Sequence, residues 1–231
     1  MTKRRLLAAI TASLSLSLGG AALLLGVADL ASVTANVWMR AWEKQGYVSD
    51  PEQWSAAYGR LSLARRLNPL NADYSANLGR LMDWQSWRHS PGSAEYEQYR
   101  VRASQYHAES VGKRPSWGYA WAHYAESQLL LGNRGYEFVQ ALEQAIVLAP
   151  WEPGVQRKVV WMGLAAWADL PGHLRVMVKE NIHRTVKLDL YLNEVVRLAV
   201  QFGWLDHLVP MMQTQRQLKV LEQHSRQLRQ R

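Results

Sequence analysis

Aromatic and basic side chains gather between residues 84 and 100, where their chemistry suits a flat, polar ligand. Tryptophan and tyrosine faces stack against sugar rings, and nearby basic side chains donate hydrogen bonds to hydroxyl groups. The group flanks a turn-rich segment at residues 87–93, and binding residues are often carried by loops. The pattern predicts a surface for carbohydrate or protein, although the same aromatic side chains would also seal a helical hairpin. The predicted members are Trp84, Trp87, Arg88, Tyr96, Tyr99 and Arg100.

A second aromatic group lies in the stretch RPSWGYAWAHYAESQLLLG, residues 114–132. Trp117 and Tyr119 are candidates for a ligand platform, and Trp117 completes the predicted binding set. The spacing of Trp117, Trp121 and Tyr124 also suits one face of a helix that packs against neighbouring helices. Packing is the favoured interpretation, with the platform as its alternative.

The sequence contains no pattern that predicts catalysis or metal binding. None of the seven histidines belongs to an HExxH motif, and GxGxxG, P-loop and GxSxG motifs are absent from the sequence. The chain has no cysteine, which excludes disulfides, cysteine-based zinc sites and thiol nucleophiles. We therefore expect no enzymatic activity, no catalytic residue, no metal site and no cofactor.

The N-terminus has the pattern of a membrane anchor. Leu6 to Ala28 are 23 residues without a charge, directly after Lys3-Arg4-Arg5. As a helix they would span about 34 Å, enough for a bilayer core. The basic cluster predicts a cytoplasmic N-terminus, with Trp38 and Trp42 at the far interface. The alternative is a cleavable signal peptide with a cleavage site at Val33-Thr34-Ala35, although such peptides have shorter apolar regions.

The net charge of +8 does not predict nucleic-acid binding. Residues 1–35 carry +2 and residues 213–231 carry +4, which leaves +2 for all the residues between them. A nucleic-acid groove is more often basic along its length. The basic, Gln-rich end at 213–231 predicts a solvated capping helix, with binding to acidic lipid or an anionic polymer as the alternative.

The remainder of the chain predicts helices joined in pairs. Apolar residues from Trp54 to Leu67 recur at steps of three and four, the period of a helix. Asp50-Pro51 predicts its start and Asn68-Pro69 its end. Pro115 and Pro150 are each predicted to end one helix and start the next, at spacings of 46 and 35 residues, and the tetratricopeptide period is about 34. The longer spacing indicates an insertion at residues 87–93, and the last helix is expected over residues 205–231.

Residues 51 to about 168 resemble the tetratricopeptide-repeat superfamily. Asn77-Leu78-Gly79 matches the Leu-Gly step of a first helix, and Ala57, Leu61 and Ala64 before Pro69 match a second helix. The resemblance implies an antiparallel helical solenoid with a concave binding face and no catalysis. The departures from the pattern are Ser75, His107 and Phe138.

A narrower resemblance combines the basic N-terminus, the apolar segment and two sequence phrases. RPSWGYAWA at residues 114–122 opens a repeat helix, and ALEQAIVLAPWEPGVQ follows at residues 141–156. Together they resemble the VpsP family of polysaccharide biosynthesis proteins. The resemblance implies a single-pass accessory protein of the machinery that makes or exports an extracellular polysaccharide. It implies no known active site.

The sequence thus predicts an all-α protein: one transmembrane helix followed by a tetratricopeptide-like solenoid of about four hairpins. We expect an anchor at 1–34, a juxtamembrane linker at 35–50, a helical-repeat domain at 51–212 and a basic helix end at 213–231. The predicted location is the bacterial inner membrane, with the C-terminal domain in the periplasm. The predicted role is a scaffold that binds other proteins of a polysaccharide assembly or export system, with the polysaccharide itself as a further partner and the membrane held through residues 6–28. The alternatives are a periplasmic glycan-binding module and an adaptor of another envelope assembly.

Overall fold

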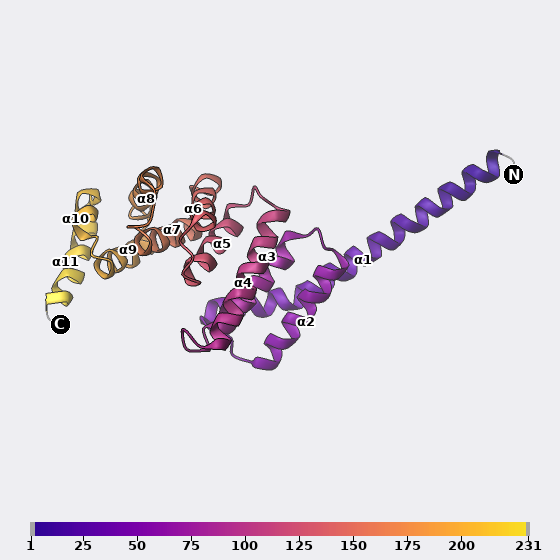
Figure 1. The fold of residues 1–231 in the computed structure, drawn as a ribbon, viewed down its shortest axis with the longest axis horizontal. Coiled ribbons are helices and arrows are strands. Elements are labelled where there is room, and N and C mark those ends of the chain that lie inside the picture. The colour runs from indigo at the N-terminus through magenta and orange to yellow at the C-terminus, as the bar shows by residue number, and fades with distance from the viewer. Residues whose placement is uncertain (1–2, 230–231) are drawn as a thin grey trace. The chain divides into compact units, whose positions relative to one another are not determined.

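The computed structural model describes residues 3–229, and within that range every element of secondary structure is a helix (Figure 1). An all-helical chain that begins with one long apolar helix is therefore confirmed. The elements are α1 (Lys3–Gln45), α2 (Pro51–Leu67), α3 (Ala72–Ser86), α4 (Ala94–Lys113), α5 (Gly118–Leu130), α6 (Tyr136–Leu148), α7 (Pro153–Ala165), α8 (Gly172–Thr185), α9 (Asp189–Gln201), α10 (Leu205–Leu208), the 3-10 helix η1 (Val209–Met211) and α11 (Gln215–Arg229).

The chain divides into two compact units, each with its own hydrophobic core. Unit 1 ends at Lys113 and contains α1 to α4, and unit 2 begins at Arg114 and contains α5 to α11. Within the units, consecutive helices pair: α1 with α2, α3 with α4, α5 with α6, and α7 with α8. In unit 2, α5 also packs on α7, and α7 packs on α9. A boundary at residue 113 falls inside the single repeat domain that the sequence predicts over 51–212.

α1 is one uninterrupted helix whose two halves have different surroundings. Its described side chains before Ala28 are exposed, and this half extends beyond α2, α3 and α4 (Figure 1). By length and composition the helix can cross a membrane. From Ala28 onward one face is buried in the core of unit 1, at steps of four and three residues that keep the side chains on one side of a helix. These residues are Ala28, Ser32, Ala35, Met39 and Trp42.

The second half of α1 differs from the expectation of a linker over residues 35–50. The chain is helical as far as Gln45, and no proline or cap interrupts it after the apolar segment. Trp42, expected at a membrane interface, is buried, and its ring meets Trp84 edge-on at 6.0 Å between centroids. The difference arises because α2 needs a partner for its apolar face, and a helix that is already formed supplies one.

The boundaries of α2 follow the predicted chemistry. The Asp50 carboxylate accepts hydrogen bonds from the backbone N–H groups of Glu52 at 2.8 Å and Gln53 at 3.3 Å, and Pro51 occupies the first turn. A cap of this kind satisfies N–H groups that have no partner within the helix. The helix ends at Leu67, one residue before Asn68-Pro69, as predicted.

In unit 2, two predicted boundaries are wrong. Pro115 lies in a turn, and α5 begins only at Gly118. The turn is held by the Trp121 indole N–H, which donates to the Pro115 carbonyl at 2.7 Å. The last helix, expected over residues 205–231, is broken into α10, η1 and α11, because Pro210 has no N–H to continue a helix. Residues 230 and 231 of the predicted helix lie outside the described part of the chain.

Candidate functional site

The predicted group at residues 84–100 is partly assembled in unit 1, around one buried arginine. The Arg100 side chain is 1% exposed, and its guanidinium lies 5.1 Å from the centre of the Tyr96 ring and 5.7 Å from that of Trp87. Both contacts have the geometry of cation–π interactions. Tyr96 is buried as well, whereas Trp87 is 57% exposed. The two aromatic rings therefore contact the Arg100 guanidinium, and of the three side chains only Trp87 is largely exposed to solvent.

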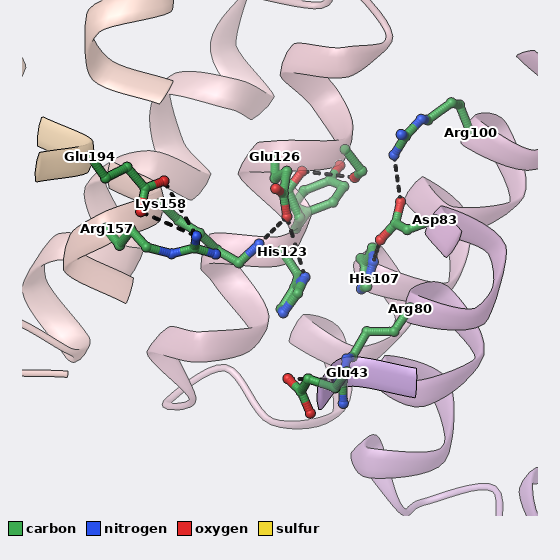
Figure 2. A network of polar contacts seen from close by, with 12 residues as sticks. Glu43, Arg80, Asp83, Arg100, His107, His123, Glu126, Arg157, Lys158 and Glu194 are labelled. Atoms are coloured by element: carbon green, nitrogen blue, oxygen red, sulfur yellow. Dashed lines mark hydrogen bonds and ion pairs between the residues drawn. The ribbon is translucent and has the colours of Figure 1, made fainter. Parts of the chain in front are cut away.

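The charge of Arg100 is balanced by an acidic residue within the same hairpin. Its guanidinium contacts the Asp83 carboxylate at 2.9 Å, and the other carboxylate oxygen lies 2.9 Å from His107 Nε2 (Figure 2). All three side chains are buried. Asp83 lies on α3, and Arg100 and His107 lie on α4. A buried charge needs such partners, so this network joins the two helices.

The other predicted members of the group are separated from this network. Trp84 packs against Trp42 on one side and lies 5.2 Å from the Arg80 guanidinium. Tyr99 contacts the rings of Trp54 and His89, with centroids 6.3 Å and 5.4 Å away. Arg88 is exposed in the turn after α3. In this part of the chain the geometry favours the sealing of a hairpin over an open ligand surface.

Unit 2 contains a second polar network, which joins α5 to α7. The Glu126 carboxylate pairs with the Lys158 ammonium group, and His123 Nδ1 lies 3.5 Å from the same carboxylate (Figure 2). Burial alone would raise the pKa of Glu126, but the positive charge of Lys158 and the hydrogen bond with His123 outweigh it and lower this pKa well below its ordinary value. The carboxylate is thereby held ionised between the two helices.

An open cleft in unit 2 is the strongest candidate for a binding site. Its volume is about 560 Å³, and two segments form its walls: residues 116–119 before and at the start of α5, and residues 148–152 between α6 and α7. Trp117 is half-buried on the first wall, beside Tyr119 at 5.8 Å between ring centroids. Trp151 is 75% exposed on the second wall. Two tryptophans and a tyrosine thus border one concave surface.

Gly118 allows the two walls to approach each other. A Cβ atom at this position would lie 2.7 Å from the Ala149 Cβ and 2.9 Å from the Ala149 backbone nitrogen. Such distances are too short for any larger residue, so α5 can start beside the 148–152 segment only with glycine here. The 148–152 segment is held in turn by Gln156, whose side-chain amide donates to the Pro150 carbonyl at 2.8 Å. The cleft is therefore built on fixed backbone.

Charged groups lie around the tryptophans of the cleft. The Arg114 guanidinium is 4.7 Å from the centre of the Trp117 ring, and that of Arg184, on α8, is 5.4 Å from the centre of the Trp151 ring. Glu152 contributes one carboxylate to the lining. Aromatic faces with two guanidinium groups suit a ligand that has flat apolar surfaces and negative charge.

The sequence predicted only part of this cleft. Trp117 belongs to the predicted binding set, and Tyr119 was its proposed companion. Trp151, Glu152 and Arg184 lie outside the predicted binding set. The missed signal is the position of Trp151 directly after the helix-ending Ala149-Pro150, since a turn leaves a large side chain exposed more readily than a helix face does.

Comparison of the chain with models of protein families, and with curated protein sequences, gives no match.

Proposed function

We propose that this chain is a membrane-anchored, helical-repeat scaffold that faces the bacterial periplasm and serves in the biosynthesis or export of an extracellular polysaccharide. Its paired helices would stack as a tetratricopeptide-like solenoid, and it would bind protein partners without catalysing a reaction. The pathway rests on the resemblance of residues 114–122 and 141–156 to the VpsP family. The bacterial inner membrane, with a cytoplasmic N-terminus, is the proposed location.

One observation supports this proposal above the others: the apolar half of α1 continues without a break into the core of unit 1. The described side chains of the first half are exposed, as lipid-facing side chains would be, and those of the second half hold α2 and α3. A folded unit joined in this way to its anchor would stay at the membrane surface. Confinement there raises the effective concentration of any partner that is also membrane-bound.

A genetic experiment tests the proposed pathway. Removal of the gene from its host should reduce extracellular polysaccharide, and the intact chain should restore it. The variant with Trp117→Ala and Trp151→Ala should restore less, and the matched control is Trp87→Ala, outside the cleft. Polymer output that does not respond to removal of the gene would refute a role in this pathway.

A reporter tests the proposed topology. Alkaline phosphatase fused after Arg231 folds to an active enzyme only outside the cytoplasm, so the fusion should be active. A cytoplasmic reporter fused at the same position should remain dark. The opposite pattern would place the helical units in the cytoplasm and remove the basis for a periplasmic role.

A second candidate function is direct binding of a glycan, and the cleft between Trp117 and Trp151 favours it. Arg114 and Arg184 against the single carboxylate of Glu152 favour an acidic sugar chain over a neutral one. The full chain in detergent should be retarded in a gel that contains polygalacturonate and should migrate freely in one that contains dextran. Equal migration in both gels would leave the cleft without a glycan and favour a protein partner.

A further inference from the structure

The turn between α2 and α3 exposes an apolar side chain at its tip. Leu70 is 84% exposed, and Pro69 beside it is exposed as well. Several polar groups of the turn have partners within the chain. The Asn71 side-chain oxygen accepts from the Asp73 N–H at 2.9 Å, and the Asn68 N–H donates to the Ala64 carbonyl at 2.9 Å. The pairing of these groups lowers the free-energy cost of moving the turn out of water.

Three side-chain contacts between α3 and α1 show which residues of α1 lie beside this turn. The Tyr74 hydroxyl, in the first turn of α3, donates to the Asp29 carboxylate. Further along α3, Asn77 donates to the Asn36 side chain at 2.9 Å, and Arg80 pairs with Glu43 at 3.1 Å (Figure 2). In these three pairs the residue numbers increase together along both helices, so α3 runs beside α1 in the same direction. The start of α3, and the turn before it, therefore lie at the level of Asp29.

Asp29 is the first charged residue after the apolar segment. It follows Arg5 by 24 residues, which is about 36 Å of helix, whereas a hydrocarbon core is about 30 Å thick and about 40–45 Å with headgroups. If the basic cluster lies in one headgroup layer, Asp29 lies in the other. Leu30, at the same level, is 73% exposed. Two exposed leucines thus lie where the bilayer that α1 would cross has its second surface.

We propose that the turn at residues 68–71 inserts into the membrane interface, with Leu70 in contact with lipid acyl chains beside Leu30. The proposal rests on the anchor role of α1 given above. Its occupant is the lipid surface itself, because the tip lies at the same level as the end of the membrane-spanning segment. Two attachments, one by α1 and one by the turn, would fix the orientation of unit 1 on the membrane where a single helix would leave it free to tilt.

The absence of cysteine allows a clean test by site-directed labelling. Single variants Leu70→Cys, Leu16→Cys and Ser90→Cys of the full chain are labelled with bimane and placed in phosphatidylglycerol–phosphatidylcholine nanodiscs. Leu16 reports insertion of α1, because it is exposed within the apolar segment. Ser90 is the matched control, since it is exposed in the turn at the opposite end of α3, about 22 Å from Leu70 along a 15-residue helix. Nanodiscs with doxyl-labelled lipid then quench any probe in contact with acyl chains.

We expect the probes at positions 70 and 16 to lose most of their emission in doxyl nanodiscs, and the probe at position 90 to keep its emission. Quenching at position 16 without quenching at position 70 would overturn the proposal that the turn inserts into the membrane interface, and the anchor role of α1 would stand. No quenching at position 16 would overturn the anchor, and with it both proposals. Circular dichroism of each variant checks that the helical content is unchanged.

Discussion

At the scale of single residues, the polar side chains of both units act mainly between helices. Asp83, Arg100 and His107 are buried together in unit 1. A buried carboxylate of this kind is stabilised by its partners, so the loss of one partner leaves a charge without compensation. The aromatic rings of Tyr96 and Trp87 add apolar cover to the same arginine.

The substitution Arg100→Met should destabilise unit 1 by about 3–5 kcal/mol, since it leaves the buried Asp83 carboxylate without its guanidinium partner. Hydrogen exchange of the α3 and α4 amides in the full chain measures this loss. The control Arg102→Met lies on the same helix but is exposed, and it should change stability by no more than about 0.5 kcal/mol. Equal effects of the two substitutions would contradict a structural role for the buried pair.

Glycine allows close contact between α3 and α4. A Cβ atom at Gly79 would lie 2.5 Å from the His107 ring. Gly79→Ala should therefore force a shift and destabilise unit 1 by about 1–3 kcal/mol, as measured by the same exchange experiment. At Gly59, in α2, no atom lies within 4 Å of the added Cβ, and Gly59→Ala should stabilise its helix by about 0.5–1 kcal/mol. A neutral Gly79→Ala would mean that α3 and α4 are not held at this distance.

The Glu126 carboxylate makes the stability of unit 2 depend on pH. Its pKa is lowered in the folded chain, below the value of about 4.3 of an unfolded glutamate. A lowered pKa gives stability above that value, and this stability is lost as the pH falls. Glu126→Gln should therefore lower the urea midpoint at pH 7, and the difference from the natural chain should shrink at pH 3. The exposed Glu180→Gln serves as control, and a difference that stays constant with pH would contradict the assignment.

At the scale of elements, α1 combines an anchor-like segment with part of a folded core, whereas the sequence predicts an anchor at 1–34 and a separate linker at 35–50. Its first half has the composition of an anchor, and its second half is part of a core. Ala35, Met39 and Trp42 are almost fully buried against their neighbours in unit 1. The helical domain of unit 1 therefore does not begin at residue 51, where the repeat pattern begins.

A chain that begins at residue 51 should fail to fold unit 1. It lacks the buried Met39 and Trp42 side chains, whose truncation alone typically costs about 2–5 kcal/mol each. Fast hydrogen exchange over α2 to α4 would report this, while a chain that begins at residue 27 should keep its protection there. Slow exchange in the shorter chain would show that α2 to α4 are sufficient without α1.

At the scale of the whole molecule, the continuity of α1 bears on its processing. The Val33-Thr34-Ala35 segment, a possible cleavage site by sequence, is helical, and Ala35 is fully buried. Proteases act on extended backbone, so cleavage there would require this part of unit 1 to open. Peptide mapping by mass spectrometry of the protein extracted from membranes should therefore recover peptides that lie before Val33 and peptides that span residues 35 and 36. A product that begins at residue 36 would contradict a retained anchor.

The sequence by itself predicted the elements whose chemistry is local. Four features depend only on residues that are neighbours in the sequence: the cap at Asp50, the helix end before Pro69, the turn at residues 87–93 and the long apolar helix. The helical class follows from the same local periods. The prediction of one helix over residues 205–231 was wrong at Pro210, because a proline has no backbone N–H to continue the helix that the apolar pattern favours.

Tertiary structure alone decided which faces meet. Burial of Trp42 and Arg100 depends on helices that lie far along the chain, and no local pattern reports such contacts. The cleft needs Trp117 and Trp151, 34 residues apart, to border the same space, and it needs Gly118 beside Ala149 to bring their segments together. The chemistry of a side chain determines what it can bind. Whether a ligand can reach that side chain depends on how the whole molecule packs.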